Sequence, residues 1–508
     1  MRLIRGLTLV SVLLSLATVA QAQTLSAKVS AWRQKNETAI VGQLADAISI
    51  RSIAVDPAGL DAQADRLKAH LDQRGFKTDL LAANGSPKVV FGRYDTPGAR
   101  RTVVFYAHYD GQPVAPRDWR SDPFVPTLRT GLGVDAAEIS DWRTGARPLD
   151  PEWRLFGRGA ADDKAAIVAF LAAFDALKAV GKRPSINIIV FWEGEEEAGS
   201  PHLPAILAAH RDRLKADLWL IGDAPVHQSR TPTLYFGVRG VMALDMTLYG
   251  PRRPLHSGHY GNWAPNPAAR LAQVIAEMRA PDGRVLIPGF SNGAQPPSAA
   301  EKAAIDALPP VDADIRREIG VAAPESEEGL TLSTQRPALN VRGLSAGQVG
   351  DQAQGAIPSQ AQAAFDIRLV PGQSPDAVRA SVETFLTKRG WTLLDGPPSE
   401  ADRAAHPQLM RLKWSGGYRA LRSDMTTPTS RAVIAAANRA AGRPVALLPM
   451  MGGSVPLNMF EDALDAPLIG LPIGNHDNNQ HAADENLRLA NLWDGIGLYA
   501  AMMADLSW

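Results

Sequence analysis

The sequence contains no cysteine among its 508 residues. This absence excludes disulfide bonds, a thiol nucleophile, thiolate metal ligands and a lipid anchor on cysteine. Any metal site would have to use carboxylate oxygens and imidazole nitrogens. The stability of the chain must come from its hydrophobic core and from any metal that it binds.

The chain also lacks an excess of charge of either sign, because 53 basic residues balance 53 acidic ones. Proteins that hold nucleic acid or anionic lipid through their electric field need a basic surface, which this composition does not supply. Hydrophobic residues make up 45% of the chain and charged residues 21%, which is ordinary for a soluble globular protein. We therefore expect a small-molecule partner and no nucleic acid.

Long apolar runs are absent beyond the first residues. The chain begins with two arginines, an apolar stretch from Leu7 to Val19, and then the small-residue sequence Ala20-Gln21-Ala22. This layout predicts a secretory signal peptide over residues 1–22, cleaved after Ala22. A membrane anchor is the alternative, but the stretch is short for a span. We expect a mature protein exported across the inner membrane, periplasmic or extracellular, and not attached to a membrane.

The order of apolar strands and amphipathic helices predicts two domains. From Leu25 to about Tyr235 strands alternate with helices, which is typical of an α/β protein with a largely parallel sheet flanked by helices. Residues 237–250 instead alternate like an antiparallel strand and begin a smaller α+β domain, a lid or dimerisation domain inserted into the larger one. The predicted parts are 23–237 and 406–508 for the catalytic domain and 238–405 for the insertion.

Within the insertion, the Pro- and Gly-rich segment 281–337 has weak periodicity. It could be disordered, a lid or an interface, and the sequence leaves these alternatives open.

Polar side chains gather where four predicted strands end. In an open α/β sheet the carboxyl ends of parallel strands meet at one edge, where ligands bind. Four carboxylates within residues 193–197 would repel one another unless water or a cation separates them. The residues of these strand ends and of one late loop that could ligate metal are His108, Asp110, Asp162, Asp163, Glu195, Glu196, Glu197, Asp223, His476 and His481.

Each of these residues alone has a simpler explanation. His108 could be a buried structural histidine, Asp162 and Asp163 could favour a helix N-terminus, and glutamates 193–197 could form a solvated first helical turn. Four strand ends that all carry such groups are difficult to explain by chance. The pattern favours two divalent ions that neutralise the crowded charge, and carboxylates with imidazoles suit Zn²⁺, Mn²⁺ or Co²⁺.

Eight ordered motifs between His108 and Asn486 resemble those of a known family. They are HYDGQP, GRGAADDK, EGEEEAGS, GDAP, LHSGHYGN, IRLVPGQ, GGSVP and QHAADEN. Together the chain resembles the carnosinase, glutamate carboxypeptidase and aminoacylase group of di-zinc hydrolases, metallopeptidase family twenty, and most closely its dipeptidase-like branch. The motifs are very specific for the family and much less so for the substrate.

The resemblance implies the positions of two metal ions, with zinc as the usual metal. Asp162 would bridge them, and its peptide bond to Asp163 would be cis. The remaining ligands that the family pattern implies are His108 and Asp223 for one ion and Glu197 and His481 for the other.

The resemblance also implies the residues that act on the substrate. Glu196 would be the general base, and Asp110 would orient a neighbouring ligand. His256 would stabilise the oxyanion, and in the family this histidine often comes from the partner subunit of a homodimer. Arg368 would bind the free carboxylate of the substrate, with Ser454 beside it. A nucleophilic role for Ser454 is disfavoured, because its flanking sequence is not G-x-S-x-G.

Several positions depart from the family pattern or have a rival. Ala165, Asn262 and Asp484 stand where other residues are usual, which leaves the shape of the substrate pocket open. His476 is the rival of His481 as a ligand, and we prefer His481. We expect no role for Glu195, and for Glu193 only support of the loop.

The sequence therefore predicts an exported di-zinc hydrolase that cleaves the amide bond of dipeptides or short peptides next to a free carboxylate. An N-acyl-amino-acid amidohydrolase with the same site is the close alternative. A catalytically silent solute-binding protein of the same fold is the alternative from another class. Glu196 argues against it, because binding alone needs no base beside the ligands.

Overall fold

The computed structural model describes residues 5–83 and 85–508, with side chains described from residue 25 onward. The predicted signal peptide, residues 1–22, therefore lies outside the described side chains, and its first four residues lie outside the description altogether. In the described part of the chain, no helix combines the length and the apolar character that crossing a membrane requires.

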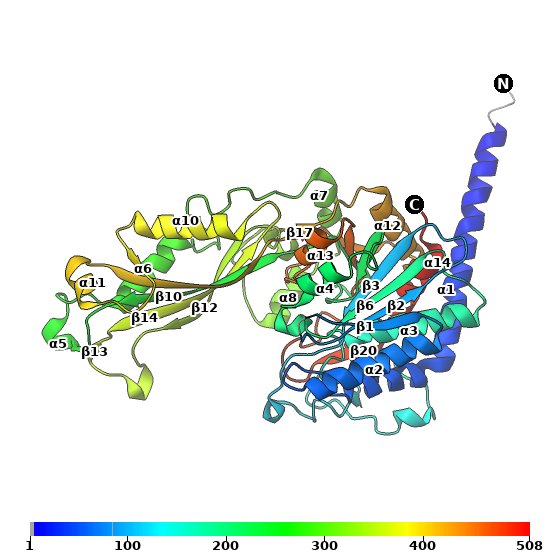
Figure 1. The fold of residues 1–508 in the computed structure, drawn as a ribbon, viewed down its shortest axis with the longest axis horizontal. Coiled ribbons are helices and arrows are strands. Elements are labelled where there is room, and N and C mark those ends of the chain that lie inside the picture. Colours follow the sequence, from blue (N-terminus) through cyan, green and yellow to red (C-terminus); the bar gives the residue numbers. More distant parts are fainter. Residues whose placement is uncertain (1–4, 84) are drawn as a thin grey trace.

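The chain forms a larger main domain and a smaller inserted domain, which lie side by side in Figure 1. The main domain contains an eight-stranded sheet in the order β1-β2-β6-β3-β7-β19-β8-β18. Its strands are β1 (Lys77–Leu81), β2 (Val89–Tyr94), β3 (Thr102–His108), β6 (Asn187–Glu193), β7 (Leu218–Ile221), β8 (Thr233–Tyr235), β18 (Ala446–Leu448) and β19 (Leu468–Gly470). The predicted α/β architecture with an inserted domain is confirmed.

The centre of the main sheet is parallel. Strands β6, β3, β7 and β19 run parallel to one another, whereas β1 pairs antiparallel with β2, β2 with β6, and β8 with β19. In the parallel register His108 at the end of β3 lies opposite Glu193 at the end of β6. The carboxyl ends of the central strands thus share one edge, as expected for a binding edge.

Helices cover both faces of this sheet, so its central strands are buried on both sides. Val103 and Phe105 of β3 pack with the helices of one face, and Val104 and Tyr106 pack with those of the other. The helices of the first face are α1 (Arg5–Ile48), α2 (Pro57–Gln73), α3 (Lys164–Ala179), α12 (Pro428–Ala441) and α14 (Leu489–Asp505). Those of the second face are α4 (Leu203–Ala209) and α13 (Asn458–Ala463).

The inserted domain contains a five-stranded sheet in the order β12-β14-β10-β16-β15. Leu244 and Phe365 of this sheet pack against Leu271 and Val382 of two helices, while the opposite face remains partly exposed. The strands are β10 (Gly240–Tyr249), β12 (Ala338–Ser345), β14 (Gln360–Leu369), β15 (Thr392–Leu394) and β16 (Leu409–Tyr418), and the packed helices are α6 (Pro267–Met278) and α10 (Pro375–Thr387).

Short elements complete both domains. Those of the inserted domain are β11 (Leu255–His256), α5 (Ser257–Tyr260), α7 (Ala299–Asp306), α8 (Asp312–Ile319), α9 (Leu330–Ser333), β13 (Ala356–Ile357) and α11 (Glu400–Ala405). Those of the main domain are β4 (Thr127–Arg129), β5 (Arg154–Phe156) and β20 (Asn486–Arg488), which form one small sheet, and β9 (Gly237–Val238) and β17 (Leu421–Arg422), which form another.

The predicted end of the insertion at residue 405 is too early for its sheet. Strand β16 pairs along its length with β10, so the inserted sheet continues to Tyr418. The chain crosses between the domains at Arg239 and again after Tyr418, and β9 pairs with β17 next to this double crossing.

Segment 281–337 contains three helices, α7 to α9, so the alternative that it is disordered is wrong. The segment also contacts the main domain, because the side-chain amide of Gln335 donates a 3.1 Å hydrogen bond to the carbonyl of Met450. It therefore lies at the junction of the two domains.

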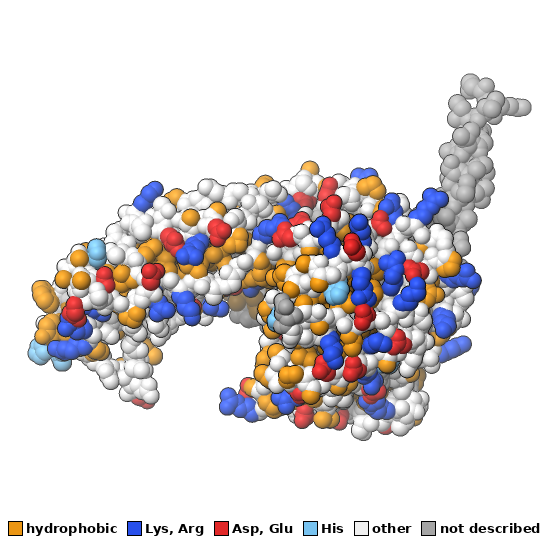
Figure 2. All heavy atoms as spheres, in the orientation of Figure 1, with side chains coloured by type: hydrophobic (Ala, Val, Ile, Leu, Met, Phe, Trp, Pro, Cys, Tyr) orange, Lys and Arg blue, Asp and Glu red, His pale blue; other side chains and the backbone are white. Residues whose placement is uncertain are grey.

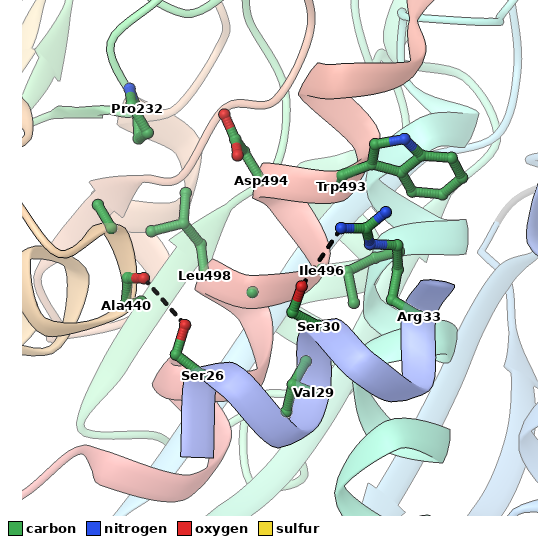
Figure 3. Close-up of a pocket in the computed structure, with 12 residues that line it drawn as sticks. Ser26, Val29, Ser30, Arg33, Pro232, Ala440, Trp493, Asp494, Ile496 and Leu498 are labelled. Carbon is green, nitrogen blue, oxygen red and sulfur yellow. Dashed lines mark hydrogen bonds between the residues drawn. The ribbon is translucent and has the colours of Figure 1, made fainter. Parts of the chain in front are cut away.

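Helix α1 packs on the main domain from Leu25 onward. Figure 3 shows this contact around a small pocket of about 140 Å³ between α1, α12 and α14. The hydroxyl of Ser26 donates a 3.3 Å hydrogen bond to the carbonyl of Ala440, and the guanidinium of Arg33 lies 5.1 Å from the centre of the Trp493 ring.

Candidate metal centre

Six side chains at the carboxyl edge of the main sheet form two adjacent groups. Within each group the potential ligand atoms lie within 4.8 Å of one another. The first group consists of His108, Glu196 and Asp223, and the second of Asp162, Glu197 and His481. All five predicted metal ligands and the predicted base are therefore brought together.

Asp162 joins the two groups. Its Oδ1 lies 3.0 Å from Nε2 of His108, and its Oδ2 lies 3.1 Å from Nε2 of His481. The same nitrogen of His481 is 3.2 Å from Oε2 of Glu197. Because each oxygen of Asp162 faces a different group, this carboxylate is placed to bridge two ions. The peptide bond between Asp162 and Asp163 is cis, as the family pattern implied.

The electrostatics of the groups fit bound cations. Burial, together with the negative charge of Asp162, raises the pKa of Asp223 to about 7. Burial also raises the pKa of Glu196 well above its usual range, with added repulsion from Asp223 and Glu197. Such crowded carboxylates resist ionising together, and two divalent ions would remove this cost. The donor set of carboxylates and imidazoles therefore fits a dinuclear site for zinc or a similar ion.

Asp110 holds the ligand loops in place. Its carboxylate is buried and accepts hydrogen bonds from the backbone N–H of Glu196, at 3.2 Å, and of Glu197, at 3.0 Å. Nδ1 of His108 lies 3.2 Å from the backbone carbonyl of Asp110. These contacts match the predicted orienting role, because one residue fixes the directions of three side chains.

Two glutamines that the sequence did not single out contact the groups directly. The amide of Gln112 donates a 2.8 Å hydrogen bond to Oε2 of Glu197, and the amide of Gln480 donates a 2.8 Å hydrogen bond to Oδ2 of Asp162. Their one sequence signal is adjacency, since Gln112 lies in the HYDGQP motif and Gln480 precedes His481.

The sequence predicts no role for Glu195, but the structure gives it one. It is buried, its Oε1 accepts a 2.9 Å hydrogen bond from the backbone N–H of His202, and its Oε2 lies 2.9 Å from Nδ1 of the same residue. It therefore closes the loop between β6 and α4. Glu193 is also buried, and its Oε2 accepts a 2.9 Å hydrogen bond from the hydroxyl of Tyr106.

His476 does not join the metal groups. In the described part of the chain it belongs to neither group, and its Nε2 instead lies 3.8 Å from a carboxylate oxygen of Glu318 on α8. The geometry therefore favours His481 over His476 as a ligand.

Arg368 and Ser454 contact each other across the domain junction. Nη1 of Arg368, on β14 of the inserted domain, donates a 2.7 Å hydrogen bond to the hydroxyl of Ser454 in the main domain. Nε of Arg368 donates a 2.8 Å hydrogen bond to Asp366. The predicted pair of substrate-binding residues is thus assembled, and Figure 2 shows that the molecule is hollowed between the two domains.

His256 is not brought to the metal groups. It lies in β11, beside α5 and β13, at the end of the inserted domain that is remote from the main domain (Figure 1). Its side chain is exposed, and Nδ1 accepts a 3.1 Å hydrogen bond from the backbone N–H of Gly258. Within one chain this histidine therefore stands apart from the other predicted site residues.

Comparison with known families and proteins gives a consistent result. The model of peptidase family M20/M25/M40 matches residues 104–505. The chain is 26% identical over 495 residues to the Cys-Gly metallodipeptidase dug1 of Schizosaccharomyces pombe, covering 93% of this chain and 96% of that protein. It is 24% identical to the Beta-Ala-His dipeptidase of Homo sapiens, covering 83% and 78% respectively.

Solved structures share the fold. Human carnosine dipeptidase 1 superposes with a TM-score of 0.74 at 22% identity, covering 95% of this chain and 98% of that one. The dipeptidase Dug1p of Saccharomyces cerevisiae superposes with a TM-score of 0.73 at 22% identity and the same coverage.

Proposed function

Since this chain belongs to peptidase family M20/M25/M40 and is thus a metallopeptidase, we propose that it is a dipeptidase that cleaves the amide bond next to a free carboxylate. The observation that carries the proposal is the pair of ligand groups joined by Asp162 with Glu196 among them. The relatives that match over most of the chain are themselves named dipeptidases.

The metal ions would be held by the five predicted ligands. His108, Asp223 and one oxygen of Asp162 would hold one ion, and Glu197, His481 and the other oxygen of Asp162 would hold the second. We propose zinc, with manganese and cobalt as alternatives, because the ligands are imidazoles and carboxylates. When bound, two such ions supply Lewis acidity to the amide carbonyl and to a water molecule.

Glu196 would move the proton. Its backbone N–H is fixed by Asp110, and burial raises the pKa of its carboxyl group, which suits a base that must later release the proton. In the proposed reaction a carboxylate oxygen of Glu196 accepts the proton of the attacking water and then delivers it to the leaving amine. Glu197 follows directly in the chain but is bonded to Gln112 and His481, which suits a ligand.

Arg368 and Ser454 would bind the carboxylate of the substrate. Nε and Nη1 of Arg368 are already engaged by Asp366 and Ser454, which holds the guanidinium in one orientation. A planar guanidinium with further N–H donors suits a carboxylate ligand. This pair would select substrates whose free carboxylate lies next to the scissile amide bond.

His256 would serve the active site of a second copy of the chain. It would donate a hydrogen bond to the oxyanion, as the resemblance implies, and its remote position in one chain favours a homodimer in which each subunit completes the other. This arrangement leaves the active site incomplete in a monomer.

Turnover separates this proposal from its alternatives. The first experiment measures metal content and hydrolysis of a panel of dipeptides and N-acyl amino acids by the metal-loaded protein. Preference for N-acyl amino acids would favour the amidohydrolase. The variant Glu196→Gln should keep its metal and lose hydrolysis by about 10³-fold or more. Glu461→Gln, an exposed glutamate on α13, is the control, and full turnover by Glu196→Gln would overturn the mechanism.

We further propose that the protein is exported and that residues 1–22 are removed. Leu25 and Ser26 of α1 contact the main domain, and removal of residues 1–22 would leave these contacts intact. Mass spectrometry of the protein from its native compartment tests this, because an intact Met1 would contradict it.

A further inference from the structure

Arg239 lies where the chain first crosses from the main domain into the inserted domain. It follows β9 and precedes β10, and its side chain is only 6% exposed. Nη2 donates a 2.7 Å hydrogen bond to the carbonyl of Arg336, while Nε has no hydrogen-bond partner among the described residues. A buried guanidinium with an unused donor is costly unless its charge is used.

Arg239 lies next to the predicted carboxylate-binding pair. Its backbone N–H donates a 3.1 Å hydrogen bond to the carbonyl of Gly453, the residue before Ser454. The hydroxyl of Ser454 lies 3.5 Å from the carbonyl of Gly240, the residue after Arg239, and accepts the hydrogen bond from Arg368. In the sheet, Val241 on β10 pairs with Arg368 on β14. The backbone of Arg239 and the side chain of Arg368 are therefore both bonded to the same short loop, at residues 453 and 454.

The charges at this loop are not balanced. Burial, together with the positive charge of Arg368, lowers the pKa of Arg239 to about 10. Asp366 is the acidic group that acts in the opposite sense, and it is already bonded to Nε of Arg368. The repulsion between the two guanidinium groups is thus offset only in part by Asp366, and an added anion would relieve it.

We propose that Arg239 is a specificity-determining residue for the free carboxylate of the substrate. It acts by its positive charge and through its position beside Arg368 and Ser454, without touching the substrate itself. The inference rests on the proposed function of Arg368 and extends it, because selection then depends on two arginines. Neutralising Arg239 removes the excess positive charge while Arg368 and its bonds to Asp366 and Ser454 remain.

A merely structural role predicts a different result. If Arg239 only held the carbonyl of Arg336 at the domain junction, its loss would weaken the binding of all substrates equally. If Arg239 acts by its charge, its loss weakens the binding of substrates that carry the free carboxylate. The binding of the corresponding C-terminal amides then stays almost unchanged. The ratio of the affinity for the free carboxylate to the affinity for the amide therefore distinguishes the two roles.

The experiment measures binding without turnover. The parent protein is metal-loaded Glu196→Gln, and Arg239→Gln or Arg239→Lys is added to it. Each protein is titrated calorimetrically with leucyl-glycine and with leucyl-glycine amide. We expect Arg239→Gln to reduce the preference for the free carboxylate by about tenfold, as the loss of one charge at close range implies. Arg239→Lys should retain most of it. The control is Arg74→Gln, at a half-buried arginine that directly follows α2 and pairs with Asp175.

Each outcome bears on the proposal. An unchanged preference in Arg239→Gln overturns it, and so does a parent protein that binds the peptide and its amide equally. An equal loss for both ligands overturns it in favour of the structural role. Failure of the wild-type protein to hydrolyse any dipeptide would count against the proposed function alone, because this binding test needs no turnover. Melting temperatures and metal content confirm that each variant is folded and loaded.

Discussion

The carboxylate of Glu485 accepts a 3.0 Å hydrogen bond from the backbone N–H of Asp162, the residue that joins the two ligand groups. The same carboxylate accepts hydrogen bonds from the backbone N–H groups of Ala161, at 3.0 Å, and Gly159, at 2.9 Å. Nη1 of Arg158 lies 2.8 Å from it. Glu485 follows His481 in one loop and fixes the other loop, so a single buried carboxylate aligns ligands from distant parts of the chain.

We expect Glu485→Gln to weaken metal binding by about 10- to 100-fold, the range usual for residues that orient metal ligands. It should also lower stability by about 3 kcal/mol, because Arg158 would be left buried without a counter-charge. Metal titration and chemical denaturation measure the two effects. Glu461→Gln is the matched control, and wild-type metal affinity in Glu485→Gln would show that the alignment of Asp162 does not depend on this carboxylate.

Removal of the metals should destabilise the protein. Without cations the carboxylates of Asp162, Glu196, Glu197 and Asp223 face one another in a buried space. At a free metal concentration 100 times Kd, binding adds about 2.7 kcal/mol per site to the free energy of unfolding. The melting temperature should fall on chelation and recover with zinc. The same melting temperature in both states would mean that the groups hold no ion.

Glu193 should make stability fall as pH rises. Burial raises the pKa of its carboxyl group to about 7 in the folded protein, against 4.5 in the unfolded chain. Between these values the folded protein binds more protons than the unfolded one, so stability is fully present below pH 4.5 and is lost as pH rises through 7. The loss amounts to roughly 3 kcal/mol.

Replacement of this group removes its titration. Glu193→Gln can still accept the hydrogen bond from Tyr106, and its free energy of unfolding should be less dependent on pH between 5 and 8. Denaturation of the metal-loaded protein at several pH values provides the comparison. Identical slopes for the variant and the parent would rule out Glu193 as the source.

Complementation tests the shared active site. Glu196→Gln and His256→Ala should each be inactive alone, since each lacks one residue at every site. When the two variants are dissociated, mixed and reassociated, random pairing restores about a quarter of the active sites. Half of the dimers then contain both variants, and each of these has one intact site. Turnover of the mixture provides the measurement, and sedimentation confirms the dimer. No recovery from a mixture of proven dimers would mean that His256 does not act across the interface.

The sequence predicted the centre of the site well because local pattern and sheet topology agree there. His108 and Asp223 each follow an apolar strand, and parallel strands bring their carboxyl ends to one edge. Asp162 and Glu197 also follow predicted strands, and the order of the motifs assigned their roles. The motifs alone located His481, whose late loop no strand pattern could have brought to the site.

Contacts that depend on the path of loops could not be predicted. Gln112, Gln480 and Glu485 approach the ligands only because distant loops fold over one another, and their neighbours in sequence carry no periodic signal. The boundary at 405 failed for a related reason. Strand β16 alternates like any strand, and only its pairing with β10, far away in the chain, assigns it to the insertion. The remote position of His256 likewise depends on the length of the inserted sheet.

The position of β19 in the middle of the main sheet has a consequence for the order in which the protein is made. This strand pairs with β7 on one side and β8 on the other, yet it follows every other strand of this sheet in the chain. A growing chain that has passed β18 still has an open sheet and lacks His481. Closure of the sheet and completion of the second ligand group therefore both depend on residues 468–481, and a chain that stops before them lacks both.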